Sequence, residues 1–162
     1  MDKGYIQVFC GNGDGKSSAA LGKAMLEAAK GNNVIIIKFM KNKDENEMEF
    51  FSKLEPEIRL FRFERSEIGF AELTEEQKAE ESMNIRNGLN YAKKVIGTGE
   101  CDILVLDEIL GVLDEGIISS EDIRSILDSK SDDMSIIITG INLPDVLRPS
   151  ANLISYISSE LK

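Results

Sequence analysis

Residues 5–31 constrain the fold more than any other part of the chain. They begin with the β-rich run YIQVFC, pass through a turn containing Gly11, Gly13 and Gly15, and end in SSAALGKAMLEAAKG, which is rich in helix formers and closes with Gly31 at a C′ position. This order predicts a strand, a glycine loop and a helix. Such a loop gathers backbone N–H groups and the positive end of a helix dipole at one point, which suits a phosphate group.

Further strands are expected along the rest of the chain. The β-branched run VIIIKFM is typical of a strand covered on both faces, which indicates a parallel sheet with helices on each side. Four other runs, IRLFRF, DILVLDE, SIIITG and NLISYI, also predict strands, the last of them at an edge. The segment ERSEIGFAEL between IRLFRF and the next helix has no period and is expected to be an irregular loop.

The intervening segments predict helices. Thr74 and Gln77 have capping-box spacing and open a helix expected to run to about Gly97. Other helices are expected in 41–57, from Ser119 or Ser120 to about Leu127, and in 142–150, stopped near Pro149. The long helix has as core candidates Met83, Leu89, Ala92 and Ile96. The prediction is a doubly wound, mainly parallel α/β sheet with helices on both faces, forming one domain over residues 1–162.

Composition excludes several classes of function. The net charge of −10 argues against a non-specific nucleic-acid binder, since phosphate backbones are bound by clustered Lys and Arg. The absence of histidine removes the commonest general base and zinc ligand. Cys10 and Cys101 lack metal-ligand spacing and are interpreted as core residues. No run is long enough for a membrane span and no secretory signal is present, so a cytoplasmic protein is expected.

The glycine loop resembles a phosphate-binding loop with one departure. Lys16 would add a positive charge for the phosphates, and Ser17 a hydroxyl for Mg²⁺. The usual pattern has a further glycine five residues before Gly15, where this chain has Cys10. The alternative, a glycine-rich turn with a surface lysine, explains poorly why three glycines alternate directly before Lys-Ser-Ser.

A pair of acids forms the second functional signal. The apolar run ILVL delivers Asp107 and Glu108 to the carboxyl end of the sheet, where ligands of open α/β sheets bind. Such acids hold Mg²⁺ or orient a nucleophile, although strands that end in solvated acids are also common. Together with the glycine loop they predict a Mg²⁺–nucleotide site.

Three features leave alternatives open. Lys38 and Lys41 flank the end of a predicted strand. Two interpretations are open for them: they bind triphosphate, or they are ordinary solvated lysines. Phe70 lies in a predicted loop, where it plugs the edge of the core or faces a flat ligand. The run KNKDENE is interpreted as a solvated loop without chemistry.

Several blocks of the sequence together resemble the ATP:corrinoid adenosyltransferases, which act on cob(I)alamin and cob(I)yrinic acid a,c-diamide. They are GYIQVFCGNGDGKSSAALGKAMLEAAKGNNVIIIKFMK, IGF, CDILVLDEILGVLDEGIIS and SIIITGINLPDVLRPSANLIS, and they cover most of the chain. The first is the most specific, because a non-glycine residue at position 10 is a feature of that family. The resemblance implies a RecA-like P-loop fold, a homodimer, and transfer of the adenosyl group of MgATP to cobalt with triphosphate as leaving group.

The resemblance also implies roles for individual residues. Triphosphate would be held by the loop residues Gly11, Asn12, Gly13, Asp14, Gly15, Lys16, Ser17 and Ser18, with Lys16 and Glu108 as catalytic residues. Ser17, Asp107 and Glu108 would serve Mg²⁺, and Phe70 would lie beside the corrinoid. The nucleophile would be Co(I) and not a side chain, so a chain without histidine can perform the reaction with an electron-donating reductase as partner.

Four departures from the family's pattern mark a divergent member. The family usually has Lys or Arg where Asp14 stands, Arg where Ile141 stands, Asp where Asn152 stands, and in some members Trp where Glu72 stands. Each positive charge lost from a triphosphate site weakens ATP binding by about 1–3 kcal/mol. Two alternatives therefore remain beside adenosyl transfer: a P-loop ATPase in which Glu108 orients water, and a nucleotide- or corrinoid-binding module without catalysis.

Overall fold

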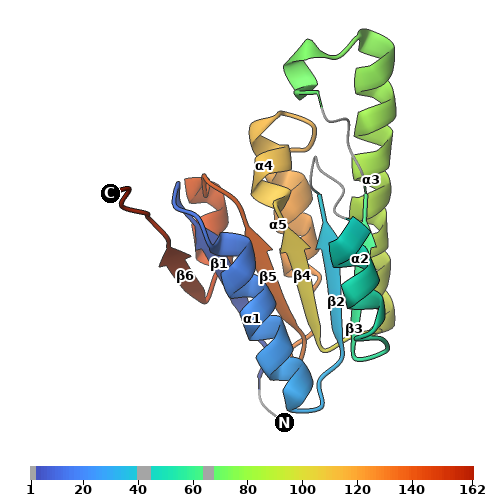
Figure 1. The fold of residues 1–162 in the computed structure, drawn as a ribbon, viewed down its shortest axis with the longest axis vertical. Helices are drawn as coiled ribbons and strands as arrows, with labels where there is room; N and C mark the ends of the chain where they lie inside the picture. The colour runs from blue at the N-terminus through green and yellow to red at the C-terminus, as the bar shows by residue number, and fades with distance from the viewer. Residues whose placement is uncertain (1–2, 40–44, 64–67) are drawn as a thin grey trace.

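The computed structural model describes residues 3–39, 45–63 and 68–162. Six strands form one sheet in the order β3-β2-β4-β5-β1-β6, and every described pairing between them is parallel (Figure 1). The strands are β1 (Ile6–Cys10), β2 (Val34–Lys38), β3 (Ile58–Arg62), β4 (Ile103–Asp107), β5 (Ser135–Thr139) and β6 (Leu153–Tyr156). The predicted parallel sheet is confirmed, with β6 at one edge.

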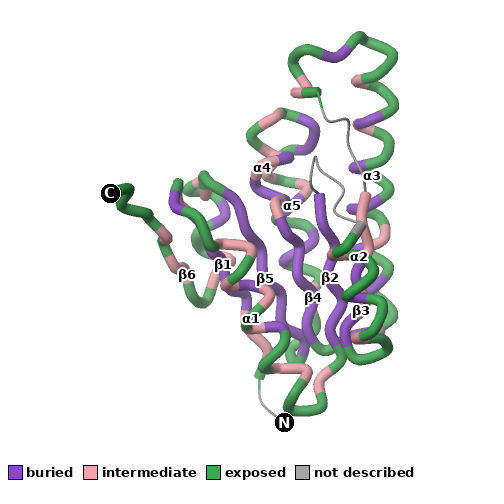
Figure 2. Tube along the Cα trace, viewed as in Figure 1, coloured by how far each residue is buried: buried purple, intermediate pink, exposed green. Residues whose placement is uncertain are grey.

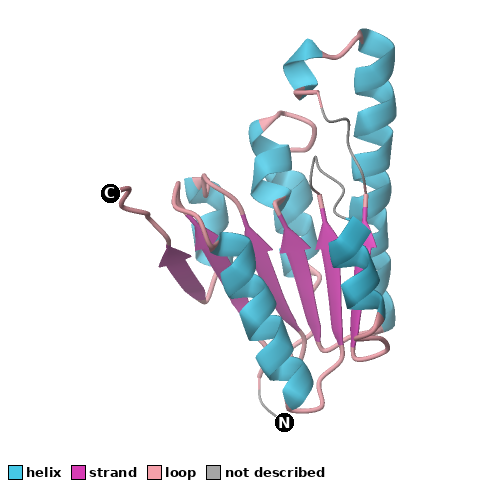
Figure 3. Cartoon of the chain, viewed as in Figure 1, coloured by secondary structure: helices cyan, strands magenta, loops and turns pink. Residues whose placement is uncertain are grey.

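Helices cover both faces of this sheet, as predicted (Figure 3). The α-helices are α1 (Lys16–Ala29), α2 (Glu45–Ser52), α3 (Glu75–Thr98), α4 (Ile109–Asp114) and α5 (Ser120–Asp128), and two 3₁₀ helices are η1 (Phe70–Glu72) and η2 (Asp145–Ser150). Helices α1 and α2 lie on one face, and α3, α4 and α5 lie on the other (Figure 1). None of the helices in the described part of the chain combines the length and apolar character that crossing a bilayer requires.

Alternation along the central strands divides the core between these two faces. Ile35 and Ile37 pack with α3, α4 and α5, whereas Val34 and Ile36 pack with α1 and α2. Every residue of β1, β2, β4 and β5 is buried, which appears as the continuous buried colour of the central strands in Figure 2. The β-branched runs thus fill two apolar layers at once, as strands of a doubly covered parallel sheet must.

Local capping signals fix the helix ends. Thr74 and Gln77 form the predicted capping box at the start of α3, and Ser119, one of the two predicted caps, forms another with Asp122 at the start of α5. Gly31 follows α1 with a φ of 94°, the left-handed conformation expected of a C′ glycine.

Two expectations were wrong in detail, and one helix was not predicted. Met83 is 65% exposed, and the buried residue in that turn of α3 is Ile85, which shares a face with Leu89 and Ala92. Helix α4 was not predicted from the sequence, because six residues are too few to show a helical period. The helix expected in 142–150 is only the 3₁₀ turn η2, which contains Pro149.

The phase of α3 can be tested by mutation. Ile85→Ala removes a fully buried side chain and leaves a cavity, so we expect the free energy of unfolding to fall by about 2–5 kcal/mol. Met83→Ala on the same helix is the control, and its change should stay within about 0.5 kcal/mol. Denaturant titration of both variants measures this, and equal losses would contradict the assigned helix face.

Candidate functional site

The glycine loop joins β1 to α1 at the carboxyl end of the sheet (Figure 1). Gly11 and Gly15 have φ angles of 112° and 106°, which glycine adopts at no steric cost. Cys10 is the last residue of β1 and is fully buried, so the position needs a small core residue and no glycine. Lys16 begins α1, and its Nζ donates to the carbonyl oxygen of Gly13 at 2.7 Å.

Backbone donors face outward from the first turn of α1. The first backbone bond of the helix runs from the Ala19 N–H to the Gly15 oxygen at 2.8 Å. The N–H groups of Lys16, Ser17 and Ser18 precede it and have no acceptor within the helix. Aligned N–H groups and the helix dipole make this end of α1 suited to an anion.

Asp107 connects the loop to the acid-bearing strand. Its Oδ1 accepts hydrogen bonds from the hydroxyls of Ser17 and Thr139, each at 2.8 Å. Thr139 Oγ1 in turn accepts the Glu108 N–H at 2.8 Å. The structure therefore brings together the two motifs that the sequence analysis paired. Thr139 was not predicted as a site residue, because its contact depends on the register of β5 beside β4.

The second oxygen of Asp107 is suited to a cation. Asp107 is 2% exposed, and its Oδ2 is buried without a hydrogen-bond partner among the described residues. Leaving a buried carboxylate oxygen unsatisfied is costly, and a carboxylate beside a serine hydroxyl is a donor set that Mg²⁺ accepts. The residues present thus fit the Mg²⁺ expected from the sequence.

Glu108 has an unusual backbone conformation. Its φ is 66°, and it is the one non-glycine residue with positive φ in the described part of the chain. The residue is also the N-cap of α4, and a Cβ placed on Gly111 would lie 3.1 Å from Glu108 Oε2. A left-handed non-glycine residue costs about 1–3 kcal/mol and is characteristic of functional sites. The side chain is consequently directed along the start of α4 at the carboxyl edge of the sheet.

The two lysines considered for triphosphate have different outcomes. Lys38 is 3% exposed and forms an ion pair with Glu47 of α2, which also pairs with Arg62 at 3.2 Å. In this structure Lys38 is therefore neither a solvated lysine nor a lysine available to bind phosphate. Lys41 lies outside the described residues, as does most of the run KNKDENE, whose last residues begin α2.

Phe70 lies beside a cavity of about 440 Å³ between η1 and the end of α4. Its ring also packs against the core and has Lys78 Nζ 5.7 Å from its centre, so the side chain both covers the core edge and faces the cavity. The cavity is lined by Gly69, Phe70, Ala71, Glu72, Asp114 and Glu115. The two elements that line it, η1 and the end of α4, lie at the same carboxyl-terminal end of the sheet as the glycine loop (Figure 1).

The four residues that differ from the pattern expected of the family, at positions 14, 72, 141 and 152, have different surroundings. Asn152 Oδ1 accepts the Ile6 N–H at 2.7 Å, which an aspartate oxygen would also do, so this change preserves the contact. Ile141 is 51% exposed, and its backbone oxygen accepts the Gly11 N–H. Asp14 is exposed within the loop, and Glu72 is exposed beside Phe70.

The cysteines are structural, as interpreted from the sequence. Both Cys10 and Cys101 are buried and unpaired by disulfides. Burial raises the pKa of the Cys10 thiol, and burial raises the pKa of Cys101 to about 12. Neither thiol is therefore a nucleophile at neutral pH. No group of three or more His, Cys, Asp or Glu side chains placed to hold a metal ion occurs in the described ranges.

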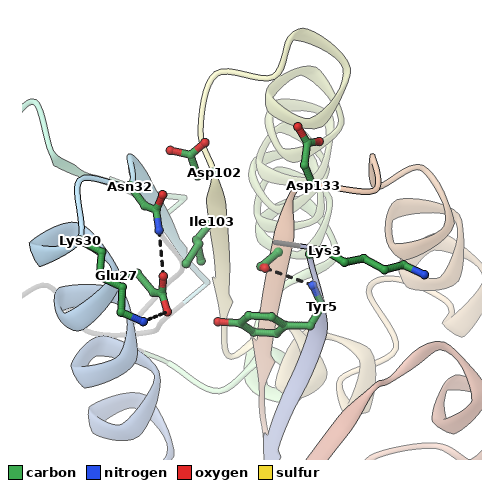
Figure 4. A pocket seen from close by; sticks show the side chains of 10 residues that line it. Lys3, Tyr5, Glu27, Lys30, Asn32, Asp102, Ile103 and Asp133 are labelled. Atoms are coloured by element: carbon green, nitrogen blue, oxygen red, sulfur yellow. Dashed lines mark hydrogen bonds and ion pairs between the residues drawn. The ribbon is translucent and has the colours of Figure 1, made fainter. Parts of the chain in front are cut away.

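A second cavity, of about 410 Å³, lies at the opposite end of the sheet (Figure 4). Among its lining residues, Glu27 accepts hydrogen bonds from Lys30 and Asn32, and Asp102 accepts one from the Asn33 N–H. Burial raises the pKa of Tyr5, which also lines it. None of the residues that line this cavity belongs to the glycine loop or to the Asp107–Glu108 pair.

Comparisons with known proteins agree with this site. The sequence model of the family described as ATP:corrinoid adenosyltransferase BtuR/CobO/CobP matches residues 2–161. The chain belongs to the ATP:corrinoid adenosyltransferase family. The family's description names the transfer of an adenosyl group from ATP to a corrinoid as the reaction of its members.

Individual relatives of this adenosyltransferase family are distant. The corrinoid adenosyltransferase CobA of Salmonella typhimurium is 29% identical and that of Escherichia coli 27%, each over 86% of this chain and 68% of the relative. An uncharacterised protein of Nostoc is 32% identical over 93% of this chain, which spans 42% of that relative. The structure of a KaiC-like protein of Pyrococcus horikoshii superposes on this chain with a TM-score of 0.65 at 15% sequence identity. The match covers 99% of this chain and 76% of the KaiC-like chain, and it confirms the RecA-like fold.

The Asp107 network can be tested at Thr139, whose hydroxyl both donates and accepts. Thr139→Val removes both hydrogen bonds in a fully buried position, so we expect the free energy of unfolding to fall by about 1–3 kcal/mol. Thr139→Ser keeps the hydroxyl and should retain more of the stability. Thermal and denaturant unfolding measure both variants, and a Val variant as stable as the Ser variant would contradict the network's role.

Proposed function

We propose that this chain transfers the adenosyl group of MgATP to the cobalt of a reduced corrinoid, cobalamin or cob(I)yrinic acid a,c-diamide, and releases inorganic triphosphate. The observation that carries the proposal is the Asp107 network, which joins the glycine loop to the acids of β4. The Phe70 cavity lies at the same end of the sheet, and in this proposal the corrinoid would contact the chain there. Family membership supports the reaction class.

The reaction balances without a side-chain base. The electron pair of Co(I) forms a bond to the ribose 5′ carbon, and the bond from that carbon to the triphosphate oxygen breaks. The oxygen keeps the bonding pair, and triphosphate leaves as an anion. No proton must be abstracted, which is compatible with a sequence that contains no histidine. What the site must provide is stabilisation of the departing charge and an in-line arrangement of the reactants.

The glycine loop would stabilise the leaving group. N–H groups at the start of α1 and the Lys16 ammonium would bind triphosphate, with the side chains of Asn12 and Ser18 at its edge. Bound Mg²⁺ would neutralise phosphate charge. Ser17 and Asp107 would hold the ion, and Glu108 would lie beside it or orient its water ligands.

The proposal extends to the protein's partners. By family resemblance we include a homodimer and a reductase that supplies the electrons for Co(I). Both cysteines are free, which suits the reducing cytoplasm where ATP and such a reductase would be available.

The test is anaerobic incubation with MgATP and chemically reduced cobalamin. We expect the adenosyl-cobalt spectrum to appear with one triphosphate released for each adenosyl group transferred. Lys16→Ala should lower kcat/KM for ATP about 10- to 100-fold, because a charged hydrogen bond to phosphate is lost. Lys30→Ala, at the exposed far end of α1, is the matched control and should leave the rate unchanged.

Other products would overturn the proposal. Release of monophosphate without a corrinoid, abolished by Glu108→Gln, would identify an ATPase in which Glu108 orients water. Binding of MgATP or corrinoid without turnover under reducing conditions would identify a non-catalytic binding module.

A further inference from the structure

The residues that follow β6 run beside the glycine loop and hydrogen-bond to it. We call residues 157–159 the strap. The Ile157 N–H donates to the Cys10 oxygen at 2.8 Å, and the Gly13 N–H donates to the Ile157 oxygen at 2.9 Å. Ser159 adds a third bond, in which its Oγ accepts the Asp14 N–H at 2.8 Å. The strap therefore continues the pairing of β6 with β1 into the loop itself.

The strap packs too closely on the loop for larger residues. A Cβ on Gly11 would lie 2.4 Å from the Ile157 oxygen, and a Cβ on Gly13 would lie 2.6 Å from the Ser158 Cα. Both contacts are with backbone, which cannot swing aside as a side chain would. Packing thus explains why Gly11 and Gly13 are both glycines: the backbone of the strap lies where a Cβ atom at either position would be.

One peptide of the loop is held at both ends. The peptide between Gly13 and Asp14 has its N–H bonded to Ser159 Oγ and its carbonyl oxygen bonded to Lys16 Nζ. In a planar trans peptide the C=O bond points opposite to the N–H bond, so an N–H held in one direction also sets the direction of the carbonyl oxygen. The Ser159 hydroxyl consequently determines the direction from which the loop presents an acceptor to the Lys16 ammonium.

We propose that Ser159 is a positioning residue for polyphosphate binding, acting through the Gly13–Asp14 peptide on Lys16. The inference rests on the proposed function only in assigning polyphosphate to this loop. Glycine-rich segments lose the most backbone freedom when they become ordered. A strap that orders the loop before the ligand arrives lowers the cost of binding, as other forms of preorganisation do. The ligand class is a linear polyphosphate, free or as the tail of a nucleotide.

The experiment measures binding of inorganic tripolyphosphate with Mg²⁺ by calorimetry. Ser159→Ala should raise the dissociation constant about three- to tenfold, the worth of one net hydrogen bond. Ser159→Thr keeps the hydroxyl and should bind within about twofold of the unmodified chain. Ser158→Ala changes the neighbouring exposed side chain and is the matched control.

A double-mutant cycle separates positioning from general destabilisation. If Ser159 acts through Lys16, Ser159→Ala should cause no further loss of affinity in a Lys16→Ala background. The same loss in both backgrounds, or equal or tighter binding by Ser159→Ala, overturns the inference, as does an unmodified chain that does not bind tripolyphosphate. A chain that binds tripolyphosphate with the expected pattern yet transfers no adenosyl group overturns only the proposed function.

Discussion

The site depends on one carboxylate oxygen, Asp107 Oδ1. Two hydroxyls converge on it, Ser17 from the start of α1 and Thr139 from the end of β5, while Asp107 itself ends β4. Three elements that are distant in sequence are thereby fixed to one buried point. Oδ1 is satisfied, whereas Oδ2 is left without a hydrogen-bond partner in the described structure, and a carboxylate oxygen of this kind suits the Mg²⁺ that we propose.

The loop is organised by backbone contacts more than by side-chain charge. The resemblance to the family leads us to expect basic residues at positions 14 and 141, where this chain has Asp14 and Ile141. The Gly11 N–H bonds to the Ile141 oxygen, and the Asp14 N–H bonds to Ser159 Oγ. These contacts keep the loop's shape whatever the side chains at positions 14 and 141 contribute. The side chains at these two positions therefore affect the charge around the site, while backbone hydrogen bonds hold the loop.

The features that could be predicted from the sequence are those that a short, contiguous pattern of residues specifies. β-branched runs identify buried strands, and the glycine loop with Lys16 and Ser17 is contiguous, so both were recognisable. Thr139 and the strap were not, because they reach the site through strand registers that no local pattern specifies. The exposure of Met83 also shows that a helix can be predicted while its phase is misjudged, since Met83 lies six residues before Leu89 and off its face.

A structure of the chain with MgATP bound tests the central claim most directly, because hydrolysis and adenosyl transfer need the nucleotide in opposite orientations. Our account predicts triphosphate enclosed by the glycine loop and Lys16, Mg²⁺ beside Ser17 and Asp107, and the ribose 5′ carbon facing the open side towards Phe70. A γ-phosphate exposed on that side, with a water held by Glu108 in line with it, would contradict adenosyl transfer and assign the site to hydrolysis.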